Sequence, residues 1–318
     1  MSALPSMPEA STRPAPHALL QKLEWTVLKR LDGALQGDYR TLFRGHGVDL
    51  ADLREYQAHD DVRHIDWNVT ARLTIPHVRQ FIEERDLTAW FLLDLSPSVD
   101  FGSLRRKREV SEDFVAVMAS LVLRRGNRAG AVLYGNQLDT VLPAKGGRHH
   151  VMHIMQRMRA RPTAAAAGAT RLADLIERAR PSIRRRSSVF VVSDFISETG
   201  WEASLARLAM RHDVTAVRLY DPVEMTLPEL GLVLMQDAET GEQIFVDTGA
   251  RGFRERFEAA AARRESELRG ALARSGVDTL ELATDVDLGD SILSFVDARR
   301  QRSRLVAGAL PLSRRHAS

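Results

Sequence analysis

The chain has 318 residues, of which 44% are hydrophobic and 27% are charged, the proportions of an ordinary globular protein with a sizeable core. It contains no cysteine, which excludes disulfides, zinc–thiolate sites, iron–sulfur clusters and cysteine nucleophiles. No apolar run reaches the roughly 20 residues that a membrane helix needs, and the first residues lack the basic start and apolar stretch of a secretory signal. We therefore expect a cytoplasmic protein without a membrane span.

The formal net charge of +3 depends on the end of the chain. Residues 299–318 carry six arginines and no acidic residue, which leaves a net charge of −3 for residues 1–298. Arg184–Arg186 form a second basic run, but no aromatic stacking platform accompanies either run. Basic runs of this kind are usually solvated, so we do not expect nucleic-acid binding. A nucleic-acid-binding module remains an alternative interpretation.

The two ends and the first third of the chain differ in pattern from the rest. Residues 1–17 are rich in Pro, Ser and Ala and are predicted to be a disordered tail, as are the basic residues 299–318. Within the mixed region 18–87, the apolar spacing from Leu19 to Leu31 predicts a helix, and 77–82 alternates like a strand. The pattern assigns no independent fold to this region.

From residue 88 to residue 298, strands alternate with helices, which predicts one α/β domain with a doubly wound, mostly parallel sheet. The tight turn at Gly135-Asn136 makes the third strand antiparallel and places it at an edge. Ligands of such sheets bind at the carboxyl ends of the strands, where the strand order reverses. The predicted strands are 88–94, 128–134, 138–142, 188–193, 214–219 and 277–282, with a hairpin of 232–236 and 243–247; the predicted helices are 105–125, 151–158, 172–179, 202–210, 251–274 and 288–299.

Oxygen-bearing side chains gather at the predicted ends of two buried strands. Asp94 ends the first strand, and Ser96 and Ser98 follow at steps of two, which in an extended segment point to the same side. Asp194 ends the strand 188–193, and Thr170 opens a helix. Carboxylate and hydroxyl oxygens suit Mg²⁺, Mn²⁺ or Ca²⁺. Each residue alone is also an ordinary cap or turn residue, so the metal site is predicted from their combination.

This combination resembles the metal-ion-dependent adhesion site of von Willebrand factor A (vWA) domains, which uses Asp-x-Ser-x-Ser, then a Thr, then an Asp. More narrowly, the chain resembles the bacterial domain-of-unknown-function 58 family over roughly residues 38–200. His59 and Val99 depart from the family pattern, which has Gly and Met there, but neither is a metal ligand. The motifs that carry the resemblance are Arg54-Glu55-Tyr56, Asp60-Asp61-Val62-Arg63, Ile65-Asp66-Trp67, Ala71-Arg72, Glu83-Glu84-Arg85-Asp86 and Phe101-Gly102.

The resemblance implies a Mg²⁺-dependent protein-binding module rather than an enzyme. In such sites a partner's acidic side chain completes the metal coordination, and the family implies a MoxR-class AAA+ ATPase as partner, with this chain as an adaptor in complex assembly or maturation. The resemblance also suggests a second interaction surface, formed by Arg54, Tyr56, Asp60, Asp61, Arg63, Asp66 and Trp67.

A metal-dependent phosphoryl-transfer enzyme is the other alternative. It would use Asp94 as nucleophile and Asp194 as a metal ligand. Such an enzyme normally has a second carboxylate two residues after the first, as acid or base, and here Ser96 occupies that position. The sequence also has no Walker loop and no glycine-rich phosphate cradle.

Overall fold

The computed structural model describes residues 14–34, 42, 52–57, 62, 65, 67–73, 75–80, 87–135, 137–160, 171–236 and 242–308. Its centre is a six-stranded sheet with the order β10-β7-β6-β3-β4-β5. Every neighbouring pair is parallel except β4 and β5, so the predicted antiparallel edge strand is confirmed. The strands are β3 (Thr88–Asp94), β4 (Arg128–Gly135), β5 (Gln137–Lys145), β6 (Ser188–Ser193), β7 (Asp213–Tyr220) and β10 (Asp278–Ala283).

The strand order reverses between β3 and β6, which lie side by side in the middle of the sheet. The chain runs outward from β3 to β4 and β5 and then returns to β6 on the other side of β3. Both central strands are continuous apolar runs, and every residue of β6 is buried. Strands covered on both faces need apolar side chains in both directions, which explains the unbroken runs.

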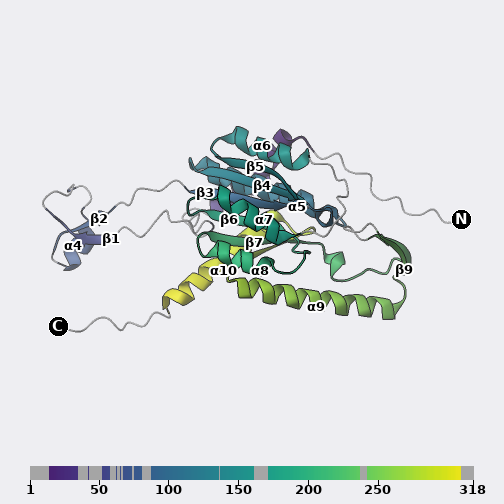
Figure 1. The fold of residues 1–318 in the computed structure, drawn as a ribbon. Coiled ribbons are helices and arrows are strands. Elements are labelled where there is room, and N and C mark those ends of the chain that lie inside the picture. The colour runs from purple at the N-terminus through teal and green to yellow at the C-terminus, as the bar shows by residue number, and fades with distance from the viewer. Residues whose placement is uncertain are drawn as a thin grey trace.

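Helices cover both faces of the sheet (Figure 1). On one face, α5, α6 and α10 enclose a core around the stacked rings of Phe91 and Phe190, 5.5 Å apart, with Phe114 edge-on to both. On the other face, α7, α8 and the end of α9 cover Leu92 and Val191. The helices are α5 (Lys107–Arg124), α6 (Arg148–Arg159), α7 (Leu172–Ala179), α8 (Trp201–Ala209), α9 (Arg251–Ser275) and α10 (Leu288–Gly308).

The N-terminal helical segment belongs to the same core. It comprises α1 (Pro16–Leu23), the π-helical η1 (Glu24–Leu28) and α2 (Lys29–Ala34), and so extends beyond the predicted helix at both ends. Its apolar side chains pack into the cluster around α5. Two short antiparallel pairs lie outside the large sheet: β1 (Asp52–Glu55) with β2 (His77–Gln80), which flank α4 (Trp67–Leu73), and the predicted hairpin of β8 (Leu232–Gln236) with β9 (Gln243–Asp247).

The last helix differs most from its prediction. It continues to Gly308, nine residues beyond the predicted end at Arg299. The charge of Arg299 was the reason to place a tail there, but its side chain is only 1% exposed and lies 2.7 Å from carboxylate oxygens of both Asp213 and Asp278. Arg299 is therefore buried in the folded domain, where two ion pairs compensate its charge. No helix of the described residues is long and apolar enough to cross a membrane.

Candidate metal site

The site lies where β3 and β6 end together at the carboxyl edge of the sheet. Leu93 is paired with Val192 in parallel register, so the next residues of the two strands, Asp94 and Ser193, end up side by side. The apolar runs hold both strands in the core, and the first polar residues after each run meet at the edge. This is the position at which doubly wound sheets bind their ligands.

Asp94 is fully buried and held by short polar contacts. The Ser193 hydroxyl donates to Asp94 Oδ2 at 2.7 Å, and the backbone N–H of Ser96 donates to Oδ1 at 3.0 Å. The hydroxyl oxygens of Ser96 and Ser98 lie 3.0 Å apart, and both side chains are buried. The structure therefore brings three of the predicted residues together.

The backbone achieves this differently from the expected extended segment. Ser96 is extended, but η3 (Pro97–Asp100) is a turn of 3-10 helix that begins directly after it. The turn, and not strand-like alternation, brings the Ser98 hydroxyl back toward Ser96. Proline fixes its own backbone angle near the helical value and lacks an N–H, so Pro97 is well suited to the first position of this turn.

Asp194 is also buried, and its carboxylate has two donors. The backbone N–H of Ile196 donates to Oδ1 at 3.0 Å, and Lys107 Nζ donates to Oδ2 at 2.7 Å. Lys107 is the first residue of α5; it is 0% exposed and also contacts Glu224 Oε1 at 2.7 Å. A buried ammonium group therefore supplies the positive charge that balances Asp194.

Lys107, Glu224 and Ser193 were not predicted as members of the site. One signal for Lys107 is its place on the buried side of α5, three and four residues before the buried Val110 and Ser111. A charged residue on the core side of a helix needs a partner. Its partners are Asp194, directly after β6, and Glu224 in the short η5 helix (Pro222–Glu224), which sequence spacing does not connect to α5.

The negative charge of Asp194 is balanced by the ammonium group of Lys107, whereas Asp94 accepts hydrogen bonds only from the uncharged groups of Ser193 and Ser96. The pKa of Asp94 is raised to about 6, because burial and, to a smaller extent, the nearby carboxylate of Asp194 raise it by more than the hydrogen bonds from Ser193 and Ser96 lower it. Burial by itself would lower the pKa of Lys107, but the carboxylates of Asp194 and Glu224 outweigh it and raise that pKa. The site therefore carries negative charge that a cation beside Asp94 would compensate.

The chain direction changes sharply after Asp194. Phe195 has a φ of 58°, the only positive value among the described residues other than glycine. A bulky residue in the left-handed region costs roughly 1–2 kcal/mol and is held there by its surroundings. Here the ring packs 5.1 Å from that of Trp201, and the Phe195 N–H donates to Ser193 Oγ at 2.9 Å. The Ser193 hydroxyl thus connects Asp94 to the turn that carries Asp194.

A third buried carboxylate, Asp221, fixes the loop between η3 and α5. It follows β7 and accepts hydrogen bonds from the backbone N–H of Ser103 at 2.7 Å and from the Thr284 hydroxyl at 2.6 Å. Burial would raise the pKa of Asp221, but these hydrogen bonds outweigh it and lower that pKa. In the same loop, a Cβ at Gly102 would lie 1.9 Å from the Arg105 carbonyl oxygen, so only glycine fits. The loop that leads from Ser98 to Lys107 is therefore fixed in position.

The donor set fits a hard divalent cation. Asp94, Ser96, Ser98 and Asp194 offer only oxygen, and Mg²⁺, Mn²⁺ and Ca²⁺ prefer oxygen ligands. Among the described residues, no group of three or more His, Cys, Asp or Glu side chains is placed to hold a metal ion. The candidate site therefore rests on two carboxylates and two hydroxyls, with water to complete the coordination. The fifth predicted ligand, Thr170, lies outside the described residues.

The predicted second interaction surface is described only in part. Arg54 is in β1, and Tyr56 comes directly after that strand. Trp67 is the first residue of α4 and is 69% exposed. Figure 1 shows β1, β2 and α4 away from the body of the six-stranded sheet. These residues are therefore not brought to the carboxyl edge of β3. Asp60, Asp61, Arg63 and Asp66 lie outside the described residues.

Comparison with solved structures gives only weak similarity. BatB from Bacteroides thetaiotaomicron, described as a conserved hypothetical protein, matches with a TM-score of 0.44 and 12% identity over 68% of this chain and 99% of its own. An aerotolerance-related membrane protein from Bacteroides fragilis matches with a TM-score of 0.42 and 15% identity over the same shares.

Comparison of sequences is more informative. The uncharacterized protein Rv1480 of Mycobacterium tuberculosis is 37% identical over 287 residues, which cover 89% of this chain and 90% of that protein. Its counterpart in Mycobacterium bovis matches with the same values. The family model described as "Protein of unknown function DUF58" matches residues 52–267, which include β3, β6 and the loops that carry the candidate site. The chain belongs to the DUF58 family.

Proposed function

We propose that this chain is a divalent-cation-dependent protein-binding module with a metal-ion-dependent adhesion site of the vWA type. Asp94, Ser96, Ser98, Thr170 and Asp194 would hold the ion, with Mg²⁺ preferred and Mn²⁺ or Ca²⁺ as substitutes. The observation that carries the proposal is the meeting of two buried carboxylates with a pair of serine hydroxyls at the point where strand order reverses.

The surroundings of the site support binding of a protein. Large apolar side chains stand exposed on the loops around it: Phe101 is 44% exposed, Leu104 79% and Ile196 37%. Exposed apolar side chains beside a charged centre are typical of surfaces that dock another protein. A divalent cation, when bound, supplies an open coordination position for a partner's carboxylate and reduces the cost of removing that carboxylate from water.

The remaining residues keep the site ready. Lys107 holds Asp194, Ser193 holds Asp94, and Asp221 fixes the loop through Ser103. Preorganisation of this kind lowers the entropy lost on binding. From the family resemblance, we further propose that the partner is a MoxR-class AAA+ ATPase and that this chain acts as an adaptor in the assembly of other complexes.

The first test is cation binding by the isolated protein. Addition of MgCl₂ or MnCl₂ should raise the melting temperature, because a ligand present at about 100 times its Kd stabilises the folded state by roughly 2.7 kcal/mol. Asp94→Asn keeps the shape of the side chain and should abolish the shift. Asp100→Asn, which removes a carboxylate paired with Arg108 in the same loop, should retain it. An equal shift in all three proteins would contradict the proposed site.

The second test is cation-dependent capture of the ATPase. The chain should retain the MoxR-class ATPase of its own organism in Mg²⁺ and release it in EDTA, and Asp94→Asn should not retain it in either buffer. Retention that is indifferent to both changes would exclude a metal-bridged interface. Turnover of p-nitrophenyl phosphate by the wild type but not by Asp94→Asn would instead support the phosphoryl-transfer alternative, which we do not favour because Ser96 replaces the second carboxylate.

A further inference from the structure

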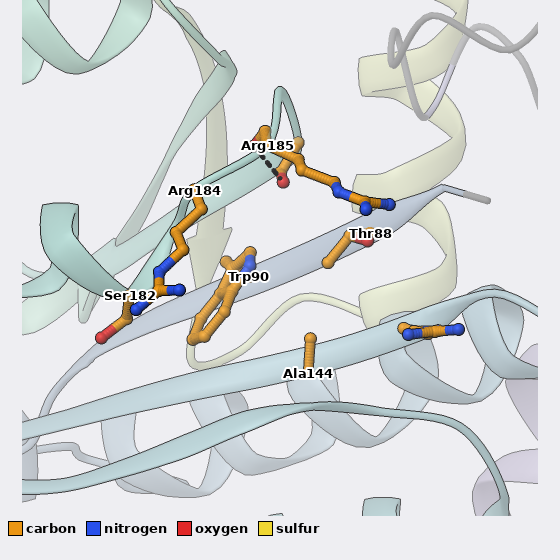
Figure 2. Close-up of a pocket in the computed structure, with 8 residues that line it drawn as sticks. Thr88, Trp90, Ala144, Ser182, Arg184 and Arg185 are labelled. Carbon is orange, nitrogen blue, oxygen red and sulfur yellow. Dashed lines mark hydrogen bonds between the residues drawn. The ribbon is translucent and has the colours of Figure 1, made fainter. Parts of the chain in front are cut away.

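A basic pocket lies at the opposite edge of the sheet, where the parallel strands begin. Its volume is about 240 Å³. Thr88 and Asp94 are the two ends of the seven-residue strand β3, so at ~3.3 Å per residue the pocket and the candidate metal site are roughly 20 Å apart. The described residues that line it are Thr88, Trp90, Arg128, Ala144, Ser182, Arg184, Arg185 and Ser187 (Figure 2).

The charged side chains that line the pocket are all positive. Three arginines line it, and no acidic side chain stands among the described residues of its wall. Arg184 and Arg185 are exposed, and within the described part of the chain their guanidinium groups form no ion pair. Two nearby arginines do form ion pairs: Arg180 and Arg207 both contact Glu177, at 2.7 and 2.6 Å.

The floor of the pocket is rigid. Trp90 is only 5% exposed, and its ring lies so close to β4 that a Cβ at Gly130 would be 2.9 Å from two ring carbons. Ala144 on the edge strand β5 is the small residue beside it. Figure 2 shows Trp90 below and between the two labelled arginines. The ring thus forms a fixed wall that offers little free face for stacking.

The backbone that carries the arginines is also fixed. Ile183 is buried on one side of the pair and Ser187 on the other, and the Ser187 hydroxyl donates to the Arg185 carbonyl oxygen at 2.8 Å. From this short segment the two side chains diverge, Arg184 toward Ser182 and Arg185 over Thr88 (Figure 2). Two guanidinium groups are therefore presented on either side of one hollow, with the hydroxyls of Thr88 and Ser182 nearby.

We propose that this pocket binds a small ligand through a phosphate group placed between Arg184 and Arg185. Guanidinium groups pair with phosphate oxygens in two-pronged fashion, and a phosphate has enough acceptors for two arginines and the hydroxyls, whereas a single carboxylate does not. The volume is below the roughly 300–1,000 Å³ of pockets for drug-sized ligands, so a free phosphate or a compact phosphate monoester fits best. A nucleic-acid strand is disfavoured because Trp90 is too buried to stack on a base.

The proposal is tested by calorimetric titration of the purified chain with inorganic phosphate and, separately, with ribose 5-phosphate. All titrations contain EDTA, so that the outcome does not depend on the site at Asp94. We expect saturable binding of at least one of the two ligands. Tighter binding of the ester would show that the pocket recognises a monoester, and equal binding that it recognises the phosphate group alone; both support the proposal.

The matched variants are Arg184→Gln with Arg185→Gln, and Arg186→Gln as control. All three side chains are exposed, so none of the changes should disturb the fold, and Arg186 belongs to the same basic run without lining the pocket. The double variant should lose at least tenfold in affinity, and the control should stay within twofold. Absence of phosphate and ester binding at 10 mM, or an equal loss in the control, would overturn the proposal. The proposal would also be overturned if a single-stranded oligonucleotide bound more tightly than either ligand and its affinity fell equally in the double variant and in the control.

Discussion

At the scale of single residues, Lys107 decides how the carboxyl edge is balanced. It is a fully buried ammonium group between the carboxylates of Asp194 and Glu224, at 2.7 Å from each. A buried ion pair adds little net stability compared with an apolar pair, but removal of one partner leaves a charge buried without compensation. The energetic role of Lys107 is therefore best measured by loss of its charge alone.

Lys107→Met keeps the length of the side chain and removes the ammonium group. We expect a loss of about 3–5 kcal/mol in the free energy of unfolding, measured by urea denaturation, because Asp194 then stays buried and unpaired. Adding Asp194→Asn to this variant should restore part of the loss. As a comparison, Arg251→Met removes an ion pair with Glu255 that lies in solvent and should leave the unfolding midpoint unchanged. Equal effects of the two Met variants would contradict the assigned role.

The sequence pattern predicted the residues of the candidate site at the strand ends and missed those that pack against them from other elements. Asp94 ends β3, Ser96 and Ser98 follow within four residues, and Asp194 comes directly after β6. Their convergence could therefore be expected from the sheet alone. Lys107 and Glu224 lie on elements that pack from the side, and nothing in the spacing of the sequence connects them. That the four converging residues bind a metal remains a prediction, and Thr170 stays untested.

At the scale of elements, the sequence predicted strands better than helix ends. β3, β6 and the hairpin strands have the predicted bounds, because each is a short apolar run between clear breaks. The last helix was predicted too short because the apolar spacing stops at charged residues. Those charges are paired in the fold: Arg299 with Asp213 and Asp278, and Arg302 with Asp278. A pattern of apolar residues does not detect a helix face that is anchored by ion pairs.

The junction of α8 with β7 contains a pH-sensitive element. His212 is 6% exposed, and its Nδ1 has no hydrogen-bond partner in the described part of the structure. Burial lowers the pKa of His212 below its usual 6.5, and the charges of Arg211, Arg186 and Arg180 lower it further. The unfolded chain therefore takes up the proton more readily than the folded one, so stability is complete above pH 6.5 and is lost as the pH falls through the folded pKa.

We expect His212→Gln to reduce the difference between the unfolding free energies at pH 7.5 and pH 5.5, measured by urea denaturation at both values. The wild type should lose more stability on acidification than this variant. His153→Gln, a change at an exposed histidine on α6, should keep the wild-type difference. A His212 variant with the full wild-type difference would show that other groups cause the acid sensitivity.

At the scale of the whole molecule, one sheet presents two different edges. The carboxyl edge gathers buried carboxylates and hydroxyls, and the amino edge gathers arginines around the pocket at Trp90. Doubly wound folds separate their two edges in this way because every central strand runs in the same direction. The alternation of strands and helices was enough to predict this architecture. It was not enough to predict which surface charges the folded chain would leave free.

Arg299 connects the last helix to the amino edge of the sheet, and its substitution tests whether the folded part of the chain includes residue 299. Its guanidinium group contacts Asp213, Asp278 and the Leu42 carbonyl oxygen, the last at 3.1 Å. Arg299→Met should cost about 3–5 kcal/mol in unfolding free energy, since two partly buried carboxylates lose their shared partner. Arg300→Met, one residue later, should cost much less, because Arg300 pairs with the exposed Asp297. If the two variants were equally stable, residue 299 would belong to a tail after all.

The buried ammonium group at Lys107 has a consequence for the order of events in the cell. Because Asp194 already has a counter-charge from within the chain, the carboxyl edge can close during folding without any ion from outside. On the proposed function, a newly made chain would then reach its native state in metal-poor conditions and bind the proposed cation afterwards. Metal supply would therefore govern how much of the protein is able to engage its partner, and not how much of it is folded.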